Sequence, residues 1–263
     1  MINSITFSSS LNLCWSSTTI PVLLSEESPL DSGPITKEET SWVVALSCLG
    51  SLFSTPIYFF LVHNYNRKFI GYLVTVPFII GWIIIIISKS VTLLYIARFI
   101  GGMGNGAALV FPPVYISEIA EDSIRGALGS FLMLFLNIGI LFGYIIGAYV
   151  NYYTYAYIGI LFPLLFIFCY YWLPETPMYL IKIGESNKAK RSLSYLRGKN
   201  EEVVQREFSK MSNFLKDREE EPESKTFKVP ETKNRSYESI LMELHRFKND
   251  KITGGSNNEA QTR

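Results

Sequence analysis

Polar side chains inside long apolar runs are the residues of this chain best suited to contact a substrate. Asn105 and Asn137 each lie in such a run, and Ser51 lies in a third beside further hydroxyl residues. An amide or hydroxyl is costly to leave unpaired in hydrocarbon, so each faces either protein or a water-filled path. We therefore expect Asn137, Asn105 and Ser51 to be candidates for a polar path, with hydrogen bonding between helices as the alternative.

Arg98 is the single charged residue in the apolar run from Leu93 to Ile116, near one end of that run. An Arg at the bilayer centre costs roughly 2.5 to 3.5 kcal/mol on insertion scales, and less where its side chain reaches the interface. We expect a structural ion pair or an interfacial anchor there, rather than a contact with substrate.

Groups that would support catalysis or bind a metal do not gather in this sequence. The apolar runs hold no paired carboxylates, and His63 and His245 stand far apart and outside them. Cys14, Cys48 and Cys169 are scattered, which indicates neither a disulfide framework nor a metal cluster. The net charge of +1 gives no reason to expect a nucleic-acid partner. We predict a protein that is not an enzyme and that needs no cofactor.

The apolar runs are long enough to cross a membrane. A helix rises 1.5 Å per residue, so about 20 mostly apolar residues cross the ~30 Å hydrocarbon layer, and lipid leaves helices as the plausible form. Spans are predicted near residues 42–62, 69–88, 93–116, 128–150 and 155–173 of a transmembrane domain, 1–173. The stretch 2–24 is rich in Ser and Thr and only moderately hydrophobic, so hydropathy does not identify it clearly as a span. We interpret it as a shortened first span, with a loose outer segment as the alternative.

Basic residues in the short loops set the orientation. They follow the first, third and fifth of these spans, at Arg67 and Lys68, at Arg125, and at Lys182 and beyond. The prediction is an integral membrane protein in the plasma membrane, with its C-terminal tail in the cytoplasm.

Glycines recur every four residues on two of the predicted spans. Gly102 and Gly106 lie on one, and Gly139, Gly143 and Gly147 lie on the other. Small residues at this spacing let helix backbones approach closely in lipid, so we expect tight packing on both faces.

The composition becomes polar after Pro174. Residues 174–216 are predicted to be a cytoplasmic helical segment, because apolar side chains recur at helical spacing in 185–198 and 201–216. Residues 217–263 are charged and predicted to be mostly disordered, with one short helix at 236–248.

Four motifs stand in order at the ends of the predicted spans. They are the R-F-I-G-G run from Arg98, P-V-Y-I-S-E ending at Glu118, R-G from Arg125, and P-E-T-P around Glu175. Together they resemble the sugar porter family of the major facilitator superfamily. Residues 20–30, 35–42 and 192–198 are similar to the insect facilitated trehalose transporters within that family.

The resemblance implies an all-α polytopic membrane protein. It would be the N-terminal six-helix half of a major facilitator fold, with a shortened first span and short cytoplasmic helices. Glu118 and Arg125 flank a turn and can join neighbouring spans by charge-assisted hydrogen bonds. In the family such charges form an inner gate, which implies gating or structural roles for Arg67, Lys68, Arg98, Glu118, Arg125 and Glu175.

Two departures from the family pattern affect the expected site. The D-R-x-G-R-R/K turn falls on residues 63–68, where the acid and the first Arg are missing. The Gln with which the family binds sugar falls on Met133, whose thioether has neither the donors nor the oxygen of an amide. Asn137, one helical turn further, is a candidate to compensate.

The resemblance implies facilitated uniport of trehalose or a hexose by a protein in contact with membrane lipid. Nothing after Gly198 resembles spans seven to twelve, so we expect an incomplete or degenerate transporter half. The alternative is a membrane protein that does not transport, and that pairs with itself or regulates a full-length transporter.

Overall fold

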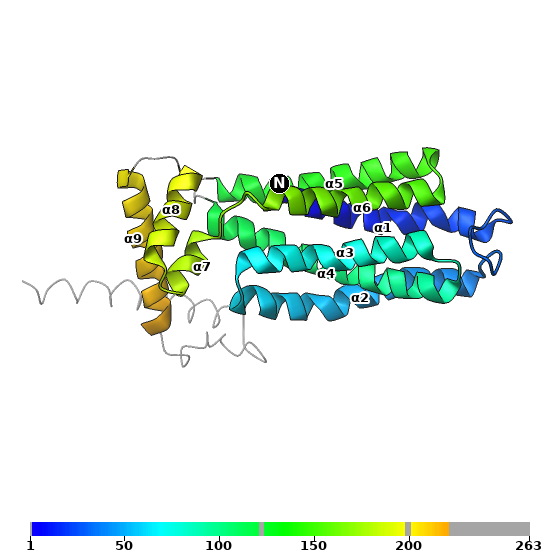
Figure 1. Cartoon of the computed structure of the whole chain (residues 1–263), viewed down its shortest axis with the longest axis horizontal. Helices are drawn as coiled ribbons and strands as arrows, with labels where there is room; N and C mark the ends of the chain where they lie inside the picture. Colours follow the sequence, from blue (N-terminus) through cyan, green and yellow to red (C-terminus); the bar gives the residue numbers. More distant parts are fainter. Residues whose placement is uncertain (1, 121–123, 198–200, 221–263) are drawn as a thin grey trace, which may run out of the picture. The chain divides into compact units, whose positions relative to one another are not determined.

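The computed structural model describes residues 2–120, 124–197 and 201–220, and this part of the chain contains helices and no strand (Figure 1). The predicted all-α fold class is confirmed. Residues 1–212 form one compact unit, and a second unit begins at Asn213, within the last helix. The helices are α1 (Asn3–Leu24), α2 (Lys37–Asn64), α3 (Arg67–Ile87), α4 (Val91–Ile119), α5 (Arg125–Tyr149), α6 (Tyr152–Tyr170), α7 (Pro177–Lys182), α8 (Ser186–Arg197) and α9 (Glu201–Glu220).

Side chains at the helix starts explain where several of these helices begin. Thr36 and Glu39 form a capping box before α2, in which each side chain accepts a hydrogen bond from the backbone N–H of the other residue. Asn66 Oδ1 accepts from the first free N–H groups of α3, and Pro177 opens α7. Gly184 follows α7 with a φ of +80°, a conformation that glycine adopts without strain.

Five of the described helices, α2 to α6, are long and apolar enough to cross a membrane. They coincide with the five predicted spans to within a few residues at each end. The chain is thus an integral membrane protein. The predicted tail helix at 236–248 lies outside the described residues. The predicted disordered tail also lies outside them, except for residues 217–220, which differ from the prediction because they continue α9.

The doubtful N-terminal stretch forms α1, a continuous helix of 22 residues. At 1.5 Å per residue it is about 33 Å long, which is enough to cross the hydrocarbon layer. It differs from the other long helices in composition rather than in length, because its buried face consists largely of Ser, Thr and Asn. α1 packs mainly on α5 and α6 and also contacts α4.

Glycines allow the closest approaches in the bundle. A Cβ atom added to Gly102 on α4 would overlap the backbone of Ser47 on α2, and one added to Gly106 would overlap Ser54. On the other glycine face, Gly139 and Gly143 of α5 lie against Ser10 and Cys14 of α1. The two predicted packing faces therefore join α2 to α4 and α1 to α5.

Helices α7 and α8 lie at the end of the bundle where α3 begins and where α4 and α6 end (Figure 1). Tyr115 near the end of α4 donates a hydrogen bond to the carbonyl of Pro174, just before α7. We refer to this end of the six long helices as the α7 end.

Candidate functional site

A polar seam joins α1 to α4 inside the bundle, and Arg98 lies at its centre. The Arg98 Nη1 group donates to the backbone oxygen of Asn12 at 3.1 Å and to Asn12 Oδ1 at 3.3 Å. Its Nη2 group donates to Ser16 Oγ at 2.8 Å, and its Cζ atom lies 5.0 Å from the centre of the Trp15 ring. Arg98 is 2% exposed, so this charge is enclosed by protein.

Asn105 extends the same seam about two turns along α4. Its Nδ2 group donates to Asn12 Oδ1 at 3.2 Å, and its Oδ1 atom accepts from Ser9 Oγ at 3.0 Å. The oxygen of Asn12 thus receives donors from both Arg98 and Asn105. This arrangement fixes the orientation of the Asn12 amide and ties α1 to α4 along two helical turns.

The structure gives Arg98 a different environment from the one the sequence suggested. Arg98 forms no ion pair with any described acidic residue, and it does not extend to an interface. Asn105 and Ser51 form hydrogen bonds between helices, which was the predicted alternative to a polar path. Asn105 is buried in the seam, and Ser51 Oγ donates to the Gly102 carbonyl at 2.9 Å across the α2–α4 contact.

A second polar feature lies on the exposed side of α5. Ser130, Asn137 and Tyr144 are all exposed and follow one another at intervals of seven residues, which puts them on one stripe of the helix. Asn137 Nδ2 donates to the Met133 carbonyl at 2.8 Å, and the Asn137 oxygen has no partner among the described residues. Met133 itself is 63% exposed beside this stripe.

Neighbouring contacts show which way the α5 stripe faces. Gly139 and Gly143 mark the side of α5 that lies against α1, and Phe142 marks the flank toward α6, because its ring lies 6.1 Å from that of Phe162. Asn137 is about 160° around the helix from Gly139, on the flank away from Phe142. The remaining exposed surface of α5 is apolar and consists mainly of Leu134, Ile138, Leu141 and Ile145.

The third polar feature is a latch at the α7 end, centred on Arg67 and Glu118. Arg67 Nε donates to both oxygens of Glu118 at 3.0 Å, and Arg67 Nη2 donates to Oε1 at 2.7 Å. Thr176 Oγ1 donates to Glu118 Oε2 at 2.8 Å. Arg67 Nη1 also donates to the Tyr65 carbonyl. The latch therefore joins the start of α3, the end of α4 and the start of α7.

The Glu175 carboxylate also belongs to the latch, because it accepts hydrogen bonds from two backbone N–H groups there. Its Oε2 atom accepts from the Lys68 N–H at the start of α3, and its Oε1 atom accepts from the Thr176 N–H, both at 3.1 Å. Burial raises the pKa of the Glu175 carboxyl above its ordinary value, while the two N–H donors and the charge of Arg67 oppose that rise. Ser192 of α8 donates to the Glu175 carbonyl at 2.6 Å.

Comparison with known proteins identifies the group to which this chain belongs. A model of the family "Sugar (and other) transporter" matches residues 8–243. The chain belongs to the sugar transporter family. The facilitated trehalose transporter Tret1 of Bombyx mori is 35% identical over 192 residues, which cover 73% of this chain and 37% of that protein. Tret1 of Polypedilum vanderplanki is 32% identical over 186 residues, covering 70% of this chain and 37% of that protein.

Solved structures of a sugar transporter share the fold. The partially occluded, inward open xylose transporter XylE from E. coli superposes with a TM-score of 0.67 at 19% identity, over 82% of this chain and 57% of that chain. Its inward open form gives a TM-score of 0.66 at 20% identity, over 82% of this chain and 56% of that chain. The chain spans only part of these relatives and corresponds to the N-terminal half of a major facilitator sugar porter.

The residues predicted from the sugar transporter motifs divide among the three features. Arg67, Lys68, Glu118 and Glu175 meet in the latch, and the Lys68 Nζ group also donates to the Tyr171 carbonyl at 3.1 Å. Arg98 and Asn105 meet in the seam, and Asn137 and Met133 lie on α5. Arg125 opens α5, and its side chain lies outside the described part of the chain.

Four important residues were missed by the sequence analysis. Asn12, Ser16 and Trp15 hold Arg98 in this sugar transporter half, and Thr176 completes the latch. Asn12 and Ser16 are four residues apart, so they share a helix face, and this spacing was the available signal. This spacing was not used, because the stretch 2–24 was not firmly assigned to a helix. Thr176 gave no signal apart from its place within the P-E-T-P motif.

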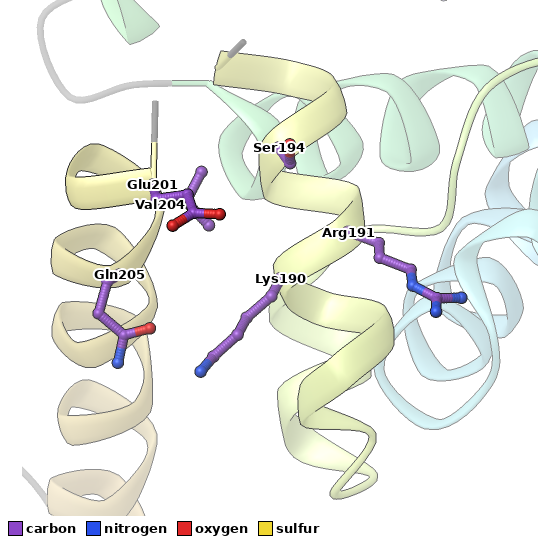
Figure 2. Close-up of a pocket in the computed structure, with 6 residues that line it drawn as sticks. All are labelled: Lys190, Arg191, Ser194, Glu201, Val204 and Gln205. Atoms are coloured by element: carbon purple, nitrogen blue, oxygen red, sulfur yellow. The ribbon is translucent and has the colours of Figure 1, made fainter. Parts of the chain in front are cut away.

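A surface cavity of about 400 Å³ lies between α8 and α9 and is lined by Lys190, Arg191, Ser194, Glu201, Val204 and Gln205 (Figure 2). Lys190 points toward α9, where its ammonium lies 4.9 Å from the centre of the Phe208 ring. Arg191 points away from α9. The two cations do not converge on one point, so this cavity is not assigned a ligand.

Proposed function

We propose that this chain forms one wall of a facilitated path for trehalose or a hexose. The observation that carries the proposal is the family match over residues 8–243, in which four motifs keep their order at the helix ends. Transporters of this architecture bind substrate near the membrane midplane, between two six-helix halves that rock against each other. A second half is therefore needed to complete the site.

The α5 stripe supports a polar path beside this wall. Asn137 is twelve residues from either end of α5, or about 18 Å, which places it near the midplane. An amide at that depth avoids lipid, because its unpaired polar atoms would face hydrocarbon. Its oxygen and its second N–H can accept from and donate to sugar hydroxyls. Asn137 thus takes the role that Met133 cannot perform.

The distribution of acids supports facilitation rather than coupling to protons. Within the six long helices, the described carboxylates are Glu38 and Glu39 at the start of α2 and Glu118 near the end of α4. Glu118 is held by Arg67 in the latch, and no carboxylate of the described chain adjoins Arg98. A proton-coupled path needs a group that changes protonation during transport, and the middle of this wall offers none with an ordinary pKa near neutral.

The latch is proposed to hold this half rigid at the cytoplasmic end of the path. The basic residues Arg67, Lys68 and Lys182 lie at the α7 end, and an excess of Lys and Arg marks cytoplasmic loops. Because the latch joins α3, α4 and α7 of one half, rocking of the two halves against each other leaves its hydrogen bonds in place. The hydrogen bonds of Glu118 therefore keep the cytoplasmic ends of these helices together as the half moves.

Uptake of radiolabelled trehalose and glucose into reconstituted vesicles tests the proposal. The chain alone should give no more uptake than empty vesicles. Co-expression with the second six-helix half of the Bombyx mori relative should give saturable uptake that Asn137→Leu reduces at least tenfold. No uptake despite a stable assembly of both halves would reject transport. Lowered uptake by a full-length relative would instead favour a regulatory partner.

A further inference from the structure

The charge of Arg98 is buried without a negative partner among the described residues. A guanidinium group keeps its positive charge in proteins. Each of its contacts in the seam is neutral: the backbone and side-chain oxygens of Asn12, the Ser16 hydroxyl and the Trp15 ring. A buried cation is expensive unless a charge of opposite sign compensates it. Neutral oxygens satisfy hydrogen bonds but do not cancel the charge.

The surroundings of Arg98 in the seam contain more buried hydrogen-bond donors than acceptors. Arg98 Nε, Asn12 Nδ2 and Trp15 Nε1 are all buried and have no partner among the described residues. The nearby oxygens are already used, because Asn12 Oδ1 accepts from both Arg98 and Asn105, and Ser16 Oγ accepts from Arg98. Asn12 and Trp15, which carry two of these donors, both contact Arg98, which carries the third. Unpaired donors beside an uncompensated positive charge indicate a negatively charged acceptor.

We propose that the Arg98 seam binds a small monovalent anion of the size of chloride. The anion accepts from Arg98 Nε and Asn12 Nδ2 and compensates the guanidinium. The anion would join α1 to α4 beside the Asn12 amide, whose oxygen already accepts one hydrogen bond from Asn105 and one from Arg98. The site is distinct from the α5 stripe and does not depend on transport by this chain.

The surroundings limit which anion can serve. Arg98 is 2% exposed, so a carboxylate carried by another protein chain cannot reach it without opening the bundle. Asn12 and Trp15 are 0% exposed, so a phosphate or an organic acid would have to displace more of the packed side chains than a single-atom ion would. Arg98 is seven residues into α4, or about 10 Å from the end opposite α7. The route to water is therefore about two helical turns.

Thermal unfolding of the purified chain in detergent tests this site. Chloride is raised at constant ionic strength by exchange against gluconate, which is too large to enter. The melting temperature should rise by about 3 to 5 °C for each tenfold increase in chloride above its dissociation constant. Retention of radioactive chloride by the immobilised protein gives a second readout that does not depend on stability.

Two variants separate the proposed site from nonspecific salt effects. Asn12→Asp has nearly the same shape and supplies a fixed carboxylate beside Arg98. It should melt higher than the wild type in gluconate, lose its chloride dependence and retain no radioactive chloride. Arg98→Gln removes the charge that requires an anion and should also lose both responses. Lys188→Gln, which removes an exposed charge, should behave like the wild type.

The proposal is overturned if the wild type melts equally in chloride and gluconate and retains no radioactive chloride. It is also overturned if Asn12→Asp keeps the full chloride dependence, because the ion would then bind elsewhere. A water molecule at the unpaired donors would produce the first of these results. Neither result bears on sugar uptake, so a failure here is separate from a failure of the proposed transport.

Discussion

Arg67 and Glu118 are 51 positions apart in the chain, and three hydrogen bonds of 2.7 to 3.0 Å join their side chains. Their side chains are only 8% and 12% exposed, so the pair is shielded from the solvent that weakens surface ion pairs. Thr176 Oγ1 also donates a hydrogen bond to Glu118 Oε2. A contact between α3 and α4 is thus extended to α7 through a single carboxylate.

Removal of the Glu118 carboxylate should destabilise the bundle substantially. Glu118→Ala leaves the Arg67 charge buried without its partner, which costs about 3 to 5 kcal/mol in comparable pairs. The exposed pair of Lys188 and Glu185 is the matched control, and Lys188→Ala should cost about 0.2 to 1 kcal/mol. Denaturant unfolding of both variants in detergent measures the difference. Equal losses would mean that the latch does not hold the helices together.

Glu175 should make stability depend on pH. Burial raises the pKa of its carboxyl in the folded state, so the folded protein binds this proton more tightly than the unfolded chain does. That contribution is fully present below the ordinary Glu pKa and is lost as pH rises through the raised pKa. Melting curves from about pH 4 to pH 7 should therefore show wild type losing stability relative to Glu175→Gln.

Parallel pH curves for the wild type and Glu175→Gln would contradict this assignment. They would mean that the N–H groups of Lys68 and Thr176, which favour the charged form, balance the effect of burial. Glu185→Gln serves as the control for loss of a carboxylate, since its side chain is 46% exposed.

A methyl group at Gly102 should disrupt the contact between α2 and α4. The added Cβ atom would overlap the Ser47 backbone, which cannot move aside as a flexible side chain could. Overpacking of this kind costs about 1 to 3 kcal/mol or more. Gly129→Ala is the control, because nothing lies within 4 Å of a Cβ atom at that position. Loss of thermal stability and of a single gel-filtration peak should occur with Gly102→Ala alone.

Cysteine labelling should distinguish the two exposed faces of α5. With Cys48 and Cys169 replaced by Ala, Asn137→Cys should react with a membrane-impermeant methanethiosulfonate reagent in vesicles that contain both halves, because this face is proposed to contact water there. Ile138→Cys and Ile145→Cys should react at least tenfold more slowly, since a thiol in lipid does not ionise. Equal reactivity at all three positions would remove the support that α5 gives to a polar path.

The sequence by itself determined the fold class and the positions of five membrane helices. Long apolar runs must be helical in lipid, because the backbone has no other partners there, and this holds whatever the neighbouring helices are. The four motifs also indicated the family and the end of the bundle where the latch lies. These properties are local, since each depends on residues within one helix or one turn.

The tertiary structure alone decided which side chains meet. Arg67 and Glu118 belong to different helices, and nothing in their separate motifs states that they form a pair. Arg98 illustrates the same limit, since its partners Asn12 and Ser16 lie on the one helix whose hydropathy was too low to identify it as a span. A polar helix is stable in this bundle because the other helices cover it, and that coverage is a property of the packed structure. For the same reason, the choice between a path and a helix contact at Asn105 and Ser51 could be made only from the packed helices.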